Sequence, residues 1–79
     1  MDEALFAQVQ RIAADVLGVA AEQITADASP DSIESWDSVN HLNLVMALEQ
    51  ELGVSFSPDD IAKMTSVGAI IGAVEAGQG

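Results

Sequence analysis

The sequence contains no cysteine and no tyrosine, and only two of its residues are basic, Arg11 and Lys63. Without cysteine the chain cannot form a disulfide, a thiolate metal site or a thiol nucleophile of its own. Its apolar runs are far shorter than the ~18 residues that cross a membrane. The opening MDEA also lacks the basic region of a signal peptide. We therefore expect a cytoplasmic protein that does not enter membranes.

The charge is strongly unbalanced. Thirteen Asp and Glu give a formal net charge of −11 over 79 residues. So negative a surface repels nucleic-acid phosphates and anionic lipid headgroups, and it attracts basic protein surfaces. We therefore expect protein partners and no nucleic acid, although the charge could also serve solubility alone.

Four segments show apolar residues at helical spacing. Helices are predicted over residues 2–17, 38–52, 58–63 and 66–76. Gly18 and Gly53 stand where glycine ends a helix, Ser57 is placed to cap the short third helix, and Thr65 or Ser66 caps the last. No strand pattern appears. The prediction is an all-α four-helix bundle with three main helices and one short third helix.

The connection between the first two helices, residues 19–37, is long for a small domain. It contains Pro30 and several Ser and Asp residues, and it has no helical period. Ile24, Ile33 and Trp36 are spaced along it, so we expect these side chains to pack the loop onto the core. The chain should then form one domain over 1–79, with a core over about 3–76 and a frayed tail at 77–79.

Few residues suit catalysis. Glycine-rich phosphate loops and a nucleophile elbow are absent, and the acidic loop lacks the glycine of an EF-hand. One His and no Cys cannot build a zinc site without several supporting carboxylates. Ser38 and His41 could touch on one helix face. A hydrolase also needs an orienting acid, an oxyanion hole and a pocket, which so small a domain can hardly enclose. We predict no enzyme, no catalytic residue and no metal site, with His41 a solvated residue near an interface.

Ser38 opens the second helix, within 33-IESWDSVNHL-42. A serine in this place is ordinarily the helix cap. Asp37 is itself a good cap, able to accept the backbone N–H of Asn40, and Trp36 could pack on the following turn as a staple. Ser38 would then stand in the first turn with its hydroxyl toward solvent. The helix dipole and free N–H groups favour a phosphate ester there.

Asp-Ser-Val at 37–39, with LVMALEQELGVSFSPDDI and MTSVGAI after it, resembles the acyl carrier protein family, including peptidyl and aminoacyl carrier domains. The resemblance covers nearly the whole chain. It implies a discrete carrier domain with the acyl-carrier type of four-helix bundle. Ser38 would hold a covalent 4′-phosphopantetheine arm from coenzyme A, and Asp37 would cap the helix and be read by the transferase. The arm's thiol would carry acyl or aminoacyl groups as thioesters, so the protein itself would catalyse nothing.

The resemblance also implies partners and two surfaces. The partners would be a phosphopantetheinyl transferase, an acyl- or aminoacyl-loading ligase and downstream synthase or transferase enzymes, with the carrier a monomer. The residues expected to face these partners are Trp36, Val39, Asn40, His41, Leu42, Asn43 and Met46. For Leu42, burial in the core is an equal alternative. The residues expected to line an interior acyl cleft are Leu44, Leu48, Phe56, Ile61 and Ile70.

Three departures from the family pattern bear on the pathway. Val39 stands where Leu is commoner, Trp36 replaces the usual residue before the Asp-Ser pair, and the positions of Asn40 and Asn43 are usually acidic in fatty-acid carriers. These features suggest a carrier for a specialised pathway, such as polyketide, nonribosomal peptide, modified-lipid or saccharide assembly. The alternatives are a fatty-acid synthesis carrier, or an acidic helical adaptor without a prosthetic group.

Overall fold

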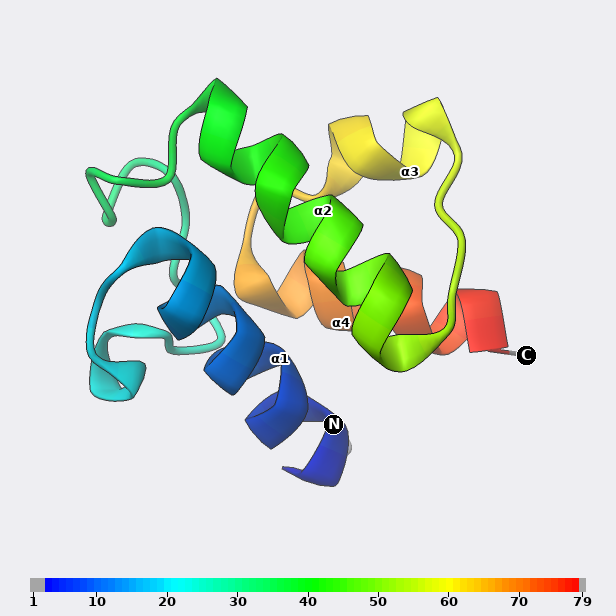
Figure 1. Ribbon diagram of the computed structural model, residues 1–79, viewed down its shortest axis with the longest axis horizontal. Coiled ribbons are helices and arrows are strands. Elements are labelled where there is room, and N and C mark those ends of the chain that lie inside the picture. Colours follow the sequence, from blue (N-terminus) through cyan, green and yellow to red (C-terminus); the bar gives the residue numbers. More distant parts are fainter. Residues whose placement is uncertain (1–2, 79) are drawn as a thin grey trace.

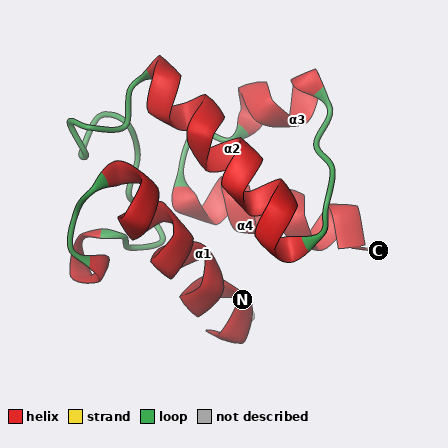
Figure 2. Ribbon diagram, viewed as in Figure 1, coloured by secondary structure: helices red, strands yellow, loops and turns green. Residues whose placement is uncertain are grey.

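The computed structural model describes residues 3–78, which are helical throughout their regular structure (Figures 1 and 2). The elements are α1 (Glu3–Leu17), the 3₁₀ turn η1 (Ala21–Gln23), α2 (Ser38–Leu52), α3 (Pro58–Lys63) and α4 (Val67–Gln78). Helix α1 packs mainly on α2 and also on α4, while α3 contacts α4. The long loop before α2 occupies one end of the bundle, at the left of Figure 1. The predicted all-α bundle with a short third helix is confirmed.

The helix boundaries differ from the prediction only at the ends. Helix α4 continues through Gln78, two residues beyond the predicted end at 76. Residue 2, the expected start of the first helix, and residue 79 lie outside the described residues. Ser66 rather than Thr65 caps α4, because its hydroxyl accepts the N–H of Ala69 at 3.1 Å.

Local sequence signals explain where the other helices stop and start. Gly18 and Gly53 end α1 and α2 with φ of 68° and 66°, in the left-handed region that L-residues rarely adopt. Ser57 opens α3 through a capping box. Its hydroxyl accepts the N–H of Asp60 at 3.1 Å, and the carboxylate of Asp60 accepts the N–H of Ser57 at 3.2 Å. These reciprocal bonds satisfy two backbone groups that the helix start would otherwise leave open.

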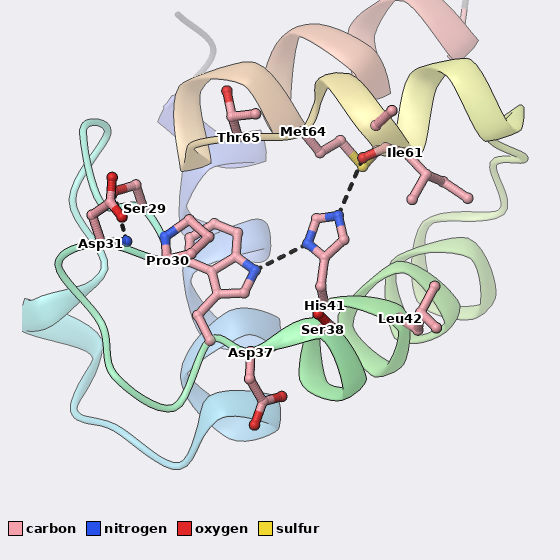
Figure 3. A pocket seen from close by; sticks show the side chains of 12 residues that line it. Ser29, Pro30, Asp31, Asp37, Ser38, His41, Leu42, Ile61, Met64 and Thr65 are labelled. Carbon is pink, nitrogen blue, oxygen red and sulfur yellow. Dashed lines mark hydrogen bonds between the residues drawn. The ribbon is translucent and has the colours of Figure 1, made fainter.

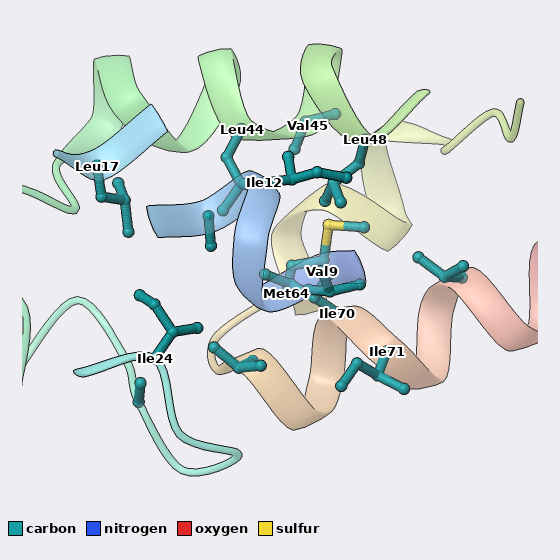
Figure 4. Close-up of a cluster of buried hydrophobic side chains, with 14 of the residues drawn as sticks. Val9, Ile12, Leu17, Ile24, Leu44, Val45, Leu48, Met64, Ile70 and Ile71 are labelled. Carbon is teal, nitrogen blue, oxygen red and sulfur yellow. The ribbon is translucent and has the colours of Figure 1, made fainter. Parts of the chain in front are cut away.

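Apart from Trp36, the core is aliphatic, as the shortage of aromatic residues requires (Figure 4). Its fully buried large side chains come from α1, the long loop, α2, the segment before α4, and α4 itself: Val9, Ile12, Ile24, Leu44, Leu48, Met64, Val67, Ile70, Ile71 and Val74. Burying a side chain of this kind contributes about 1.5–3 kcal/mol each relative to exposure. None of the described helices is long and apolar enough to cross a membrane.

The long loop is packed, as the spacing of its apolar residues predicted. Ile24, Ile33 and Trp36 are all buried. Polar contacts hold the backbone of this segment: the Gln10 side-chain amide donates to the carbonyls of residues 21 and 24, at 2.8 and 3.1 Å, and the Ser35 hydroxyl donates to the carbonyl of residue 17 at 2.8 Å. The loop is therefore held against the bundle, and its last residue, Asp37, lies at the start of α2.

The same loop is also tied to α4. The N–H of Gly68 donates to the Ala26 carbonyl at 2.8 Å. A Cβ atom at Gly68 would lie only 3.2 Å from that carbonyl oxygen, so glycine permits the close approach of α4 to the loop. This contact holds the loop against the start of α4.

Candidate functional site

Ser38 is the first residue of α2, and its side chain is exposed. The capping role falls to Asp37, whose carboxylate accepts the N–H of Asn40 at 2.8 Å. The backbone carbonyl of Asp37 accepts the first intrahelical bond, from the N–H of His41 at 2.8 Å. Among the described residues, no hydrogen bond engages the Ser38 hydroxyl. The structure therefore bears out the division between a capping Asp and a free Ser.

Trp36 is buried, with only 2% of its surface exposed. Its indole N–H donates to Nδ1 of His41 at 3.0 Å, and the two ring centroids lie 6.1 Å apart (Figure 3). The side chain therefore belongs to the core and does not face a partner, contrary to the expectation for Trp36. The physical reason is that its large apolar ring fills the junction between loop and helix, while its N–H finds an acceptor on the next turn.

His41 is half-buried and bonded at both ring nitrogens. Its Nε2 lies 3.2 Å from the backbone carbonyl oxygen of Ile61 in α3. Because the indole N–H of Trp36 can only donate, Nδ1 must accept, so Nε2 carries the ring proton and donates to Ile61. The prediction of a solvated His41 is wrong. With both nitrogens engaged elsewhere, the imidazole cannot serve Ser38 as a base, which removes the Ser–His pair considered for a hydrolase.

An exposed apolar row runs along α2 from the residue after Ser38. Val39, Leu42 and Met46 are 68%, 54% and 57% exposed. For Leu42 the structure decides against burial in the core. Large apolar side chains left in water in this way are typical of surfaces that bind partners.

The polar neighbours of this row are neutral, and the first turn of α2 contains no acidic residue. The Asn40 side-chain amide donates to the Ser35 carbonyl at 2.8 Å, which ties α2 to the loop. Asn43 is exposed, and its amide donates to the Asn40 side-chain oxygen at 3.3 Å. Asn40 therefore has a structural task, whereas Asn43 is free to face a partner.

A groove of about 730 Å³ opens beside Ser38, between the loop, the start of α2 and α3 (Figure 3). Its lining comprises Ser29, Pro30, Asp31, Trp36, Asp37, Ser38, His41, Leu42, Ile61, Ala62, Met64 and Thr65. Of the residues expected to line an acyl cleft, only Ile61 is among them.

The other four expected cleft residues lie elsewhere. Leu44, Leu48 and Ile70 are 0% exposed within the core, and Phe56 is half-buried beside it. Sequence reasoning missed the loop and α3 residues of the groove, because their meeting depends on tertiary packing. One contact of the groove could have been predicted from the sequence. The indole N–H of a buried Trp needs an acceptor, and His41, one turn into the next helix, has a ring nitrogen that can accept it.

Comparison with known proteins identifies the family. The family model described as a phosphopantetheine attachment site matches residues 7–74. The acyl carrier protein of Thermotoga maritima is 34% identical over 73 residues, which cover 92% of this chain and 90% of that protein. The chain belongs to the acyl carrier protein family. The acyl carrier protein of Nitratidesulfovibrio vulgaris is 38% identical over 60 residues, covering 76% of this chain and 79% of that one.

The fold agrees with that membership. A solution structure of holo acyl carrier protein from Geobacter metallireducens is 25% identical and matches with a TM-score of 0.83, over 92% of this carrier and 84% of that chain. The carrier thus holds acyl groups on a covalent 4′-phosphopantetheine group and is not a catalyst. Its general partners are a phosphopantetheinyl transferase and acyl-processing enzymes.

Proposed function

We propose that Ser38 is the attachment point of the 4′-phosphopantetheine arm. The observation that carries the proposal is the exposed hydroxyl of Ser38 at the head of α2, left unbonded because Asp37 supplies the cap. It lies within the matched residues 7–74 and on the rim of the groove. The residues present therefore fit the arm.

The chain's own contribution is electrostatic and positional. The N–H groups of Ser38 and Val39 have no intrahelical acceptor, as at the start of any α-helix. These N–H groups and the helix dipole favour the negative charge of a phosphodiester. Asp37 holds α2 in place by its cap bond, so the serine is presented from a rigid support. The arm, when attached, supplies the thiol on which acyl groups are carried, which a chain without cysteine cannot provide.

Loading in vitro tests the attachment point. The unmodified protein is incubated with coenzyme A and a promiscuous phosphopantetheinyl transferase, and its intact mass is measured. We expect one phosphopantetheine on the native sequence and none on Ser38→Ala. Ser55→Ala is the matched control, because Ser55 is also exposed, and it should load normally. An adduct on Ser38→Ala, or none on the native sequence, would refute the proposal.

We further propose that this carrier serves a specialised pathway of the kinds named above. The support is the neutral start of α2, with Asn40 and Asn43 beside exposed Val39 and Leu42. A partner that reads carboxylates near the serine loses charge-assisted contacts here. A partner with an apolar, weakly charged surface fits the row better. A carrier of aminoacyl groups, a cytoplasmic location, a monomeric state and a single domain over 1–79 stay predictions.

Transfer by a fatty-acid malonyl transferase tests the pathway. We expect slow malonylation of the loaded carrier and faster malonylation of Asn43→Glu, which restores an acidic residue at an exposed position. Asn43→Gln keeps the position neutral and should remain slow. If the native carrier is malonylated as fast as a fatty-acid carrier, the fatty-acid alternative is correct.

A further inference from the structure

The groove beside Ser38 meets the core of the bundle at the buried side chains of Trp36 and Met64, which line it. The interior side chains Leu44, Leu48 and Ile70 are 0% exposed. The groove lies outside them, with Ile61 and Met64 on its α3 side. Helices α2 and α3 both line the groove, and the boundary between them, called the α2–α3 seam here, offers cargo a route from Ser38 to the interior.

His41 bridges that seam. Its ring extends from the first turn of α2 to the Ile61 carbonyl of α3, while its other nitrogen is held by Trp36 (Figure 3). Trp36 is itself fixed, because it is buried and its backbone N–H donates to the Ile33 carbonyl at 3.0 Å. The imidazole thus joins three segments, the loop, α2 and α3, within the lining of the groove.

Moving α3 away from α2 would break the bond from Nε2 of His41 to the Ile61 carbonyl, whereas the bond between Trp36 and His41 lies on the α2 side and would remain. The N–H of the half-buried imidazole and the Ile61 carbonyl would then each need a new partner, which costs free energy wherever water cannot reach them. The groove, by contrast, offers cargo a mixed lining. Ser29, Asp31 and Thr65 are polar, and Leu42 and Ile61 are apolar. Such a lining suits an amide-bearing arm with a short or polar acyl group.

We propose that His41 is a positioning residue that keeps the α2–α3 seam closed, so that cargo attached at Ser38 lies in the surface groove and not among the interior side chains. The proposal rests on Ser38 as the attachment point. It predicts that a longer acyl group alters the surroundings of the groove side chains and not those of the core side chains in the native protein. Without the His41 bridge, a longer acyl group should also alter the surroundings of the core side chains.

Methyl NMR of acyl-loaded protein tests the proposal. Acetyl and octanoyl forms are prepared with the transferase, and the Leu and Ile methyl shifts of the two forms are compared. In the native sequence we expect differences at Leu42 and Ile61 and none at Leu44, Leu48 or Ile70. In His41→Ala the differences should appear at the interior methyl groups.

His41→Gln is the matched control. Its amide oxygen can accept from the indole and its NH₂ group can donate to the Ile61 carbonyl, so it should behave as the native sequence does. Interior shifts in the native octanoyl form would overturn the proposal by themselves, even if His41→Ala fails to fold. The same pattern in the native sequence and folded His41→Ala would also overturn it.

The loading step is scored separately by intact mass. Failure to load counts against attachment at Ser38 but does not test whether His41 keeps the α2–α3 seam closed. In that case free octanoyl pantetheine is added in excess to unloaded protein, and the same methyl groups are compared. Shifts at the interior methyl groups of the native sequence would again contradict a closed seam, and shifts confined to the groove would support it.

Discussion

The indole N–H of Trp36 donates to Nδ1 of His41 at 3.0 Å, across the junction of the long loop and α2. This bond orients the imidazole so that Nε2 faces the Ile61 carbonyl at 3.2 Å. Trp36 and His41, on either side of Ser38 in the sequence, are therefore held by hydrogen bonds in which the Ser38 hydroxyl takes no part. The proposed modification site is therefore an exposed hydroxyl whose neighbours Asp37 and His41 are held in place by hydrogen bonds.

The first prediction concerns the state of the His41 ring. We expect the neutral tautomer with hydrogen on Nε2, which ¹⁵N NMR of the imidazole detects directly. Trp36→Phe removes the donor and part of the buried ring, and it should lower the free energy of unfolding by about 1–3 kcal/mol in urea. A hydrogen found on Nδ1 in neutral His41 would contradict the bond.

The second prediction concerns the helix cap. Asp37→Ala removes the acceptor for the N–H of Asn40, so it should cost about 0.5–2 kcal/mol of stability, measured by urea unfolding. Asp37→Asn keeps a capping oxygen and should cost much less. Asp31→Ala, at an exposed position of the long loop, controls for the loss of one negative charge. Equal effects at Asp37 and Asp31 would show that charge, not capping, governs stability.

The third prediction separates surface from core on one helix. Leu44→Ala empties a site that is 0% exposed and should cost about 2–5 kcal/mol of stability. Leu42→Ala truncates a side chain that is 54% exposed and should stay within about 0.5 kcal/mol. On the loaded carrier, Leu42→Ala should slow acyl transfer to a cognate partner enzyme. Transfer at the native rate would show that Leu42 lies outside the partner surface.

Local sequence signals predicted most of the helix boundaries, because the residues that begin or end a helix act within a single turn of the chain. Gly18, Gly53 and the capping box at Ser57 mark helix ends by backbone geometry alone. The Asp37 cap follows from the same rules. The environment of Trp36 and His41 could not be read in this way, since it depends on how the loop, α2 and α3 meet. The same limit explains why the expected cleft shares only Ile61 with the groove: helical spacing separates core from surface, but it does not place one helix against another.

The fourth prediction concerns pH. The Thr25 hydroxyl donates to the Asp27 carboxylate at 2.6 Å and, with the backbone N–H of Asp27, holds the pKa of that carboxyl below its ordinary value of 3.8. A depressed pKa contributes stability above the unfolded-state pKa, and this contribution is lost as the pH falls through the folded-state pKa. Thr25→Ala should raise the pKa of Asp27 in a carboxyl ¹³C NMR titration, whereas Thr65→Ala should not. An unchanged titration in Thr25→Ala would show that the hydroxyl is not the cause.

The most direct test of the central claim is the mass of the protein purified from its native host, with fragmentation to locate any modification. We expect a phosphopantetheine group on the peptide that contains Ser38, with or without an acyl group on its thiol. The unmodified mass in cells that make the pathway's product, or a phosphopantetheine group on another serine, would contradict the account.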